Sequence, residues 1–107
     1  MAEAKRFAFR SDLKPEKVQD YIDLHAEPWP ELIELLQKCH IGNYSIALRG
    51  TEVFTYYEYD GEDFEADMAY LDSQPVMQRW WIYSKPCFLH HDQSHYYDDL
   101  NEVFYCP

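Results

Sequence analysis

Hydrophobic and polar residues alternate along residues 6–10 and 52–59, which is the period of a half-buried β-strand. Residues 44–48 are predicted to form another strand, joined to 52–59 by the short Arg49-Gly50-Thr51 connection. Both faces of residues 52–59 carry aromatic side chains, which indicates burial on both sides or a sheet face that lines a pocket. Residues 102–105 are predicted to form a closing strand.

A helix is predicted from about residue 15 to residue 39, after a turn that contains capping residues. The prolines on either side of Trp29 remove backbone donors, so this helix must kink or break near Trp29. Residues four apart lie on the same side of a helix, which places Tyr21, His25 and Trp29 together. A break beside His25 would open the backbone next to a candidate site.

Two more helical segments are predicted, one over residues 62–71 and one from Pro75 through Tyr83, whereas residues 86–98 have no clear period. The resulting order β-α-β-β-α-β is the ferredoxin-like pattern. Residues 1–107 are therefore interpreted as one α+β domain. With helices on one face, the other face of the sheet is expected to be apolar and covered by a second copy in a homodimer.

The net charge of the 107 residues is −11, which argues against binding to nucleic acid or to an anionic membrane surface. No apolar run approaches the length of a membrane span, and the N-terminus lacks the apolar core of a signal peptide, so a cytoplasmic protein is expected. The three cysteines have no paired spacing and are expected to be free thiols.

Aromatic residues make up 18% of the chain, including ten tyrosines and three tryptophans. Most such rings pack in cores, but tyrosine and tryptophan also suit a ligand that is apolar on its face and polar on its edge, such as a monosaccharide. His25 stands among these rings as a titratable group. A histidine in such a setting is more often a satisfied core residue than a catalytic one, and the surrounding motifs change that balance.

Four motifs occur together in order along the chain: Trp29-Pro30-Glu31-Leu32, Asn43-Tyr44, Gln78-Arg79-Trp80-Trp81 and Glu102-Val103-Phe104-Tyr105. With them the chain resembles the L-rhamnose mutarotases over essentially its whole length. The resemblance implies a dimeric α+β barrel. It also implies the exchange of α and β sugar anomers by proton transfer and bond rotation, which needs no metal or cofactor.

The resemblance also implies roles for individual residues. His25 matches the catalytic proton donor of the family, Tyr21 and Tyr44 match tyrosines that contact the substrate, and Trp80 and Trp81 match the tandem tryptophans that bind the sugar. From the residues alone, both tyrosines can equally be core residues. The two tryptophans point to different sides of any helix, so at most one can face a pocket squarely.

Some positions have other readings or depart from the family. Trp29 is assigned to packing where the prolines break the helix. Ala26, Pro28 and residues 85–91 differ from the usual family pattern, which bears on which sugar is preferred. The histidines of residues 90–95 could supply metal ligands, but their spacing matches no standard zinc pattern, and a loop without metal is the favoured interpretation.

The sequence therefore predicts a homodimeric mutarotase for a 6-deoxyhexose, with L-rhamnose as the expected substrate and His25 as general acid and base. L-fucose is the alternative substrate, because one sequence does not resolve a single epimeric hydroxyl. Two alternatives from other classes stay open: a non-catalytic protein of this fold that binds a small ligand, and a cofactor-free monooxygenase.

Overall fold

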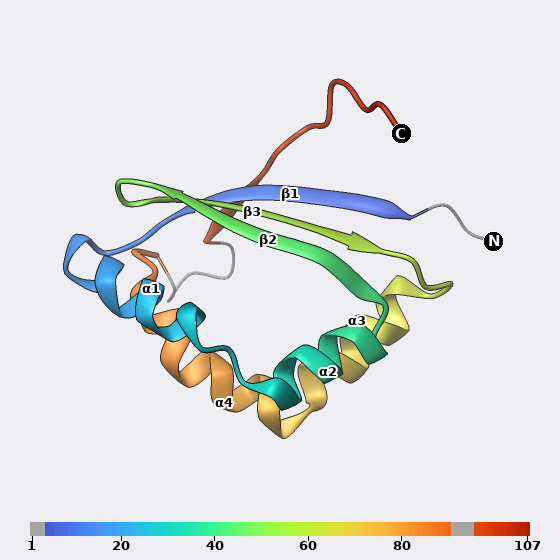
Figure 1. The fold of residues 1–107 in the computed structure, drawn as a ribbon, viewed down its shortest axis with the longest axis horizontal. Coiled ribbons are helices and arrows are strands. Elements are labelled where there is room, and N and C mark those ends of the chain that lie inside the picture. The colour runs from blue at the N-terminus through green and yellow to red at the C-terminus, as the bar shows by residue number, and fades with distance from the viewer. Residues whose placement is uncertain (1–3, 91–95) are drawn as a thin grey trace.

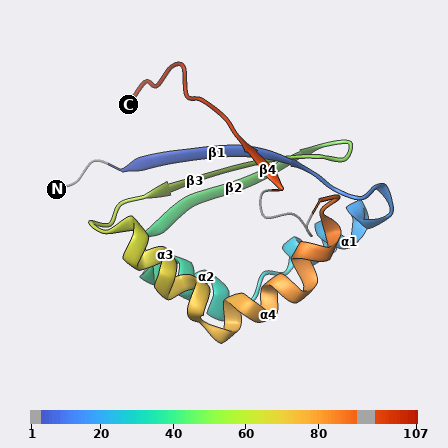
Figure 2. The same cartoon turned by 180° about the vertical axis from the view of Figure 1, so that it is seen from behind.

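The structure is a computed structural model that describes residues 4–90 and 96–107, and it consists of a sheet with helices on one face (Figures 1 and 2). Within these residues the sheet is antiparallel and has the order β2-β3-β1-β4. Its strands are β1 (Lys5–Asp12), β2 (Ile41–Arg49), β3 (Glu52–Tyr59) and β4 (Tyr97–Asp99). The predicted α+β class and the predicted order of elements are confirmed.

Two pairs of helices make the crossovers between strands. The segments are η1 (Pro15–Lys17), α1 (Val18–Ala26), α2 (Pro30–Lys38), α3 (Phe64–Ser73), α4 (Pro75–Ser84) and η2 (Lys85–Cys87). The predicted break near Trp29 is confirmed: Trp29 has an extended backbone, and Pro30 begins α2 at a position where a missing N–H costs nothing. No helix in the described ranges is long and apolar enough to cross a membrane.

Alternation along the strands decides which side chains face the helices. Phe7 stacks on Phe64 of α3, with ring centroids 4.9 Å apart, so every second residue of β1, including Phe9 and Ser11, points toward the helices. Their partners on β3 do the same, and Tyr57 stacks on Phe7 with centroids 5.0 Å apart. The prediction that both faces of residues 52–59 carry aromatic side chains is therefore confirmed.

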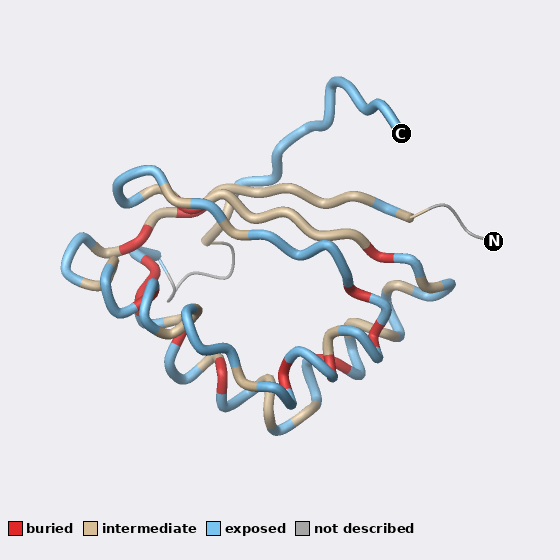
Figure 3. The backbone as a smooth tube through the Cα atoms, in the orientation of Figure 1, coloured by how far each residue is buried: buried red, intermediate tan, exposed pale blue. Residues whose placement is uncertain are grey.

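The core is divided into two clusters. One contains Leu13, Tyr21, Val53, Cys87 and Phe88, and the other contains Leu35, Cys39 and Leu71. On the sheet, buried residues are confined to its two ends (Figure 3). Cys39, Cys87 and Cys106 are free thiols, as predicted. The middle of the sheet therefore has no buried apolar cluster between it and the helices.

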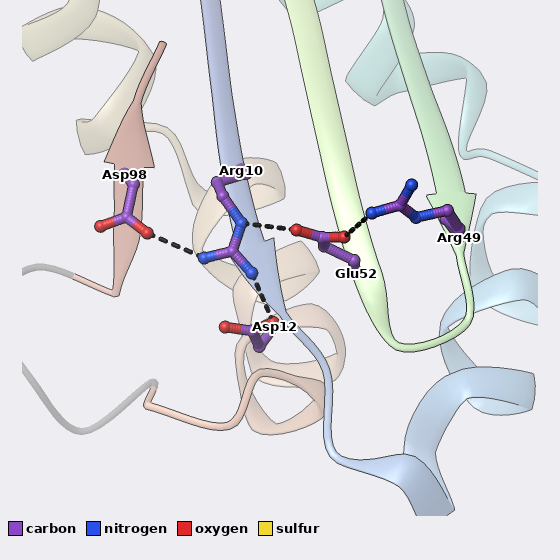
Figure 4. Close-up of polar contacts among 5 residues, drawn as sticks. All are labelled: Arg10, Asp12, Arg49, Glu52 and Asp98. Atoms are coloured by element: carbon purple, nitrogen blue, oxygen red, sulfur yellow. Dashed lines mark hydrogen bonds and ion pairs between the residues drawn. The ribbon is translucent and has the colours of Figure 1, made fainter.

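The open face of the sheet is less apolar than predicted. Arg10, near the end of β1, binds three carboxylates on this face, those of Asp12, Glu52 and Asp98, at 2.6–2.9 Å (Figure 4). Glu52 also accepts a hydrogen bond from Arg49 on β2. Arg10 thereby joins β1 to β3 through Glu52 and to β4 through Asp98, and these ion pairs hold this part of the open face together.

The prediction of a closing strand at residues 102–105 is wrong. The closing strand is β4, and residues 100–107 have no regular secondary structure. After Leu100 donates a hydrogen bond to Ala8, the chain leaves the edge of the sheet and runs on the side away from the helices (Figure 1). Side chains hold it there: Glu102 accepts hydrogen bonds from Arg6, and the Arg6 guanidinium lies 3.4 Å from the centre of the Tyr105 ring.

Candidate active site

His25 lies in the last turn of α1, and its Nδ1 atom is 2.8 Å from the backbone carbonyl oxygen of Tyr21. A carbonyl oxygen can only accept, so Nδ1–H donates and the neutral ring carries its lone pair on Nε2. The centroid of the imidazole is 4.2 Å from that of the Tyr21 ring and 5.2 Å from that of Trp80, which it meets edge to face. The imidazole is thus held in one tautomer between two aromatic residues.

Burial lowers the pKa of His25 below its ordinary value of 6.5 because it disfavours the charged ring. The hydrogen bond to the Tyr21 carbonyl opposes this shift but has the smaller effect. His25 is therefore neutral at pH 7, with Nε2 able to accept a proton.

His25 lines a cavity between the sheet and the helices that has two adjoining parts, of about 210 and 320 Å³. Both parts share His25, Tyr44, Ile46, Met77 and Trp80. The smaller part, here named the hydroxyl end, is also lined by Ser11, Tyr21, Thr55, Ser84, Tyr96 and Tyr97. The larger part, here named the apolar end, is also lined by Pro28, Leu32, Ile33 and Leu36.

This cavity occupies the gap between the two core clusters. Tyr21 and Phe88 of the first cluster line its hydroxyl end, whereas Leu36 and Met77, which pack against the second cluster, line its apolar end. The helix break contributes as well, because Pro28 borders the apolar end. The imidazole therefore lies where a polar and an apolar surface meet.

Tyr21 and Tyr44 both line the hydroxyl end. Tyr21 is buried in α1, and burial raises the pKa of its hydroxyl. Tyr44 is 46% exposed, yet burial of its hydroxyl in the cavity raises the pKa of that group too. Within the described residues, neither hydroxyl has a hydrogen-bond partner in the protein. Both therefore stay protonated near neutral pH and can donate to a ligand.

A β-bulge directs Tyr44 into the cavity. The pairing of β2 with β3 shifts between Gly42 and Ser45, and Asn43 has a left-handed backbone with φ +46°. As a result Asn43 donates a hydrogen bond to Glu58, whereas the neighbouring Tyr44 stacks on Tyr57 with ring centroids 5.6 Å apart.

Trp80 and Trp81 both line the hydroxyl end, although only Trp80 contacts His25. Trp80 is buried, and Trp81 is partly buried with the Lys85 ammonium 4.1 Å from its ring centre. The two indoles thus reach one cavity from adjacent positions of α4, with Trp80 the closer to the imidazole.

Trp29 does not lie on the same helix as His25, because α1 ends at Ala26. The prediction that Tyr21, His25 and Trp29 share one helix side is therefore wrong for Trp29. Its ring packs edge to face against Trp80, with centroids 5.2 Å apart. Trp29 thus supports the cavity wall from behind, which agrees with its assignment to packing.

Sequence reasoning missed several residues that line the cavity, notably Ser11, Thr55, Ser84 and Tyr96. Two signals could have found some of them. Ser84 follows Trp80 by four residues and so lies on the same side of α4. Thr55 lies two residues from Val53 and from Tyr57 on β3, so alternation along the strand places its side chain on the face toward the helices. Tyr96 lies in the stretch without a period and could not be placed.

No group of three or more histidine, cysteine, aspartate or glutamate residues in the described part of the chain could hold a metal ion. The predicted histidine loop includes His91 and His95, which lie outside the described residues. Around His25 the described residues offer an imidazole that can transfer a proton, phenol hydroxyls that can donate, and aromatic faces that form apolar walls.

Comparison with known proteins gives one consistent match. A family model for L-rhamnose mutarotase matches residues 6–106. An L-rhamnose mutarotase from Brucella anthropi is 34% identical over 104 residues, which is 96% of this chain and 97% of the relative. The L-rhamnose mutarotase from Oceanobacillus iheyensis is 35% identical over 104 residues, or 94% of this chain and 97% of the relative.

The fold agrees with this match. The crystal structure of an L-rhamnose mutarotase from Formosa agariphila superposes with a TM-score of 0.75 at 24% identity, covering 96% of this chain and 99% of that one. The family model and the relatives together cover both the helix break and the tandem tryptophans. The chain therefore belongs to the L-rhamnose mutarotase family.

Proposed function

We propose that this protein is an L-rhamnose mutarotase, an isomerase that interconverts the α and β anomers of the sugar. The observation that carries the proposal is His25, a neutral imidazole that is fixed by the Tyr21 carbonyl at the junction of the two ends of the cavity. Family membership supplies the substrate class, and the cavity provides apolar and hydroxyl-bearing walls on either side of the imidazole.

In the proposed mechanism, Nε2 of His25 takes the proton from the anomeric hydroxyl O1. The C1–O5 bond breaks as a C1=O1 bond forms, and the ring oxygen O5 receives a proton. Both oxygens are bonded to C1, so the imidazolium that took the proton from O1 is within reach of O5 and can deliver it there. Rotation about the C1–C2 bond and closure by the reverse steps then give the other anomer.

Other residues of the cavity have supporting roles in this proposal. The hydroxyls of Tyr21 and Tyr44 donate hydrogen bonds to sugar oxygens, including those that gain negative charge as the ring opens. Trp80 and Trp81 provide an apolar wall for the C–H face of the ring, and the apolar end receives the C6 methyl group.

NMR saturation transfer between the anomeric protons of L-rhamnose tests the proposal. We expect the protein to accelerate exchange, and His25→Ala to reduce that acceleration by about 10²–10⁴-fold, the usual contribution of general acid–base catalysis. His40→Ala is the matched control, because His40 is exposed, does not line the cavity, and interacts with Asp60 and with the ring of Tyr59. Normal exchange with folded His25→Ala protein would falsify the proposed role.

The same NMR measurement, made with different sugars, tests which sugar is the preferred substrate. We expect exchange of L-rhamnose to be accelerated most, that of L-fucose next and that of D-glucose least. An apolar contact with the C6 methyl discriminates by only about 1–3 kcal/mol, whereas a misplaced hydroxyl leaves a buried partner unpaired. Faster exchange of L-fucose would reassign the substrate, and equal acceleration of D-glucose would remove the preference for a 6-deoxy sugar.

We also propose that the protein is a homodimer. Support comes from the side of the sheet away from the helices, where the tail of residues 100–107 carries exposed apolar side chains, including Val103 and Phe104. Apolar groups exposed this far favour a protein partner. The ion pairs around Arg10 make part of that side polar, so the proposed interface is mixed and centres on the tail.

A further inference from the structure

Ser11 and Ser84 are the two buried polar residues in the described part of the chain, each with 6% of its surface exposed. Neither hydroxyl has a hydrogen-bond partner in the protein among the described residues. A hydroxyl that has no protein partner costs about 1–3 kcal/mol when it is also cut off from water. Two such groups in one small domain therefore call for a reason other than packing.

The hydroxyl of Ser84 departs from usual helix behaviour. A serine inside a helix commonly donates to the carbonyl four residues earlier, which here belongs to Trp80. Ser84 makes no such bond, whereas Ser73, near the end of α3, donates to the carbonyl of Tyr70, three residues earlier, at 2.7 Å. The Ser84 hydroxyl is thus left without its local partner.

Neither oxygen is sealed inside the protein. Within the described residues no fully enclosed side-chain nitrogen or oxygen lacks a partner, so the oxygens of Ser11 and Ser84 must touch space that water can enter. The space that both residues line is the hydroxyl end of the cavity. Ser11 reaches it from β1 in the sheet, and Ser84 reaches it from α4 in the helix layer.

We propose that Ser11 and Ser84 are sugar-binding residues that hold ring hydroxyls of the substrate from opposite walls of the hydroxyl end. The inference rests on the proposed function and extends it, since no motif of the sequence points to either serine. A serine hydroxyl both donates and accepts, as a sugar hydroxyl does, so each contact can satisfy both groups. The two serines thereby select for the positions of hydroxyls away from the anomeric carbon.

Alanine substitutions test this, with Ser45→Ala as the matched control because Ser45 is exposed on the other face of the sheet, opposite Tyr56. We expect Ser11→Ala and Ser84→Ala to raise KM for L-rhamnose by about three- to tenfold, the value of one neutral hydrogen bond, with kcat largely retained. Without sugar, the melting temperature should be unchanged or higher, because no protein hydrogen bond is lost. A purely structural role would instead lower it.

A set of L-rhamnose derivatives deoxygenated at C2, C3 or C4 gives the decisive readout. For each serine we expect one derivative on which the variant and the wild-type protein have equal KM, because the hydroxyl that the serine binds is absent. If each variant raises KM equally for every derivative, or changes none, the assignment is overturned. Wild-type protein that neither accelerates exchange nor gains thermal stability with any of these sugars would overturn the proposed function itself, and this inference with it.

Discussion

The backbone carbonyl of Tyr21 fixes the tautomer of His25, because it lies 2.8 Å from Nδ1 and can only accept a hydrogen bond. The two residues are one helical turn apart, so α1 itself orients the imidazole. Among the described residues no negative charge raises the pKa of the ring, and burial lowers it. The spacing of four residues therefore determines which nitrogen is free for the sugar, and burial determines that this nitrogen is unprotonated.

The pH dependence of exchange follows from this environment. Nε2 must be unprotonated to accept the O1 proton, so acceleration should be constant near neutral pH and fall as His25 becomes protonated. Because the pKa of His25 is lowered, the midpoint of this fall should lie below pH 6.5. Saturation transfer from about pH 5 to pH 8 measures it. A midpoint above 6.5 would contradict this expectation and indicate a carboxylate partner that the described residues do not supply.

The hydroxyl of Tyr21 should matter for exchange and not for stability. It has no protein partner among the described residues, so Tyr21→Phe should leave the free energy of unfolding nearly unchanged and reduce exchange of L-rhamnose about tenfold. Tyr59→Phe is the converse variant. The Tyr59 hydroxyl donates to Asp67 at 2.5 Å and accepts from the Asp63 backbone N–H, so its loss should cost about 1–3 kcal/mol of stability and spare exchange.

Chemical denaturation and saturation transfer on both tyrosine variants make this comparison. The proposed role of Tyr21 in binding fails if Tyr21→Phe destabilises the protein as much as Tyr59→Phe does while exchange per folded molecule stays normal.

The sequence predicted the elements well where local signals are strong. The prolines beside Trp29 ended one helix and began the next, and alternation identified β1 and β3. The cavity could not be predicted to the same extent, because it lies in the space between two separate core clusters, and that space depends on how the whole chain packs. Ser11 lines the cavity because β1 continues through Asp12, beyond the predicted strand of residues 6–10, and alternation then turns Ser11 toward the helices.

The tail was mispredicted for a related reason. Val103, Phe104 and Tyr105 have the composition of a strand, and composition does not say whether a neighbouring edge is available. β4 takes the free edge of β1 with residues 97–99, and the chain then crosses to the open face. The tail is held there by hydrogen bonds from Arg6 to Glu102, which is ninety-six positions later in the sequence. A contact between residues so far apart produces no local sequence pattern from which it could be predicted.

Exchange should survive removal of metal ions. Proton transfer between O1, Nε2 and O5 needs no Lewis acid. The negative charge that develops on O5 as the ring opens is neutralised by the proton that the His25 imidazolium delivers. Prolonged dialysis against EDTA, followed by saturation transfer with L-rhamnose, measures this. Loss of exchange that one added divalent metal restores would contradict the mechanism and direct attention to residues 90–95.

The proposed homodimer can be tested at the tail. Phe104 is 82% exposed in the single chain, and Phe104→Asp would place a charge where a partner is expected to bury the ring. We expect the dimer dissociation constant to rise by about tenfold or more, with the fold of each subunit unchanged. Ile82→Asp is the control, because Ile82 is 67% exposed on α4 in the helix layer.

Light scattering over a micromolar concentration range measures the dimer dissociation constant of the wild-type protein and of each variant. If the interface uses the tail, only Phe104→Asp shifts the equilibrium, and circular dichroism remains that of the wild-type protein. Equal weakening by Ile82→Asp would move the interface to the helices, and a wild-type monomer at these concentrations would exclude the dimer. Because His25 and the hydroxyl end lie within one subunit, a monomeric Phe104→Asp protein should still accelerate anomer exchange.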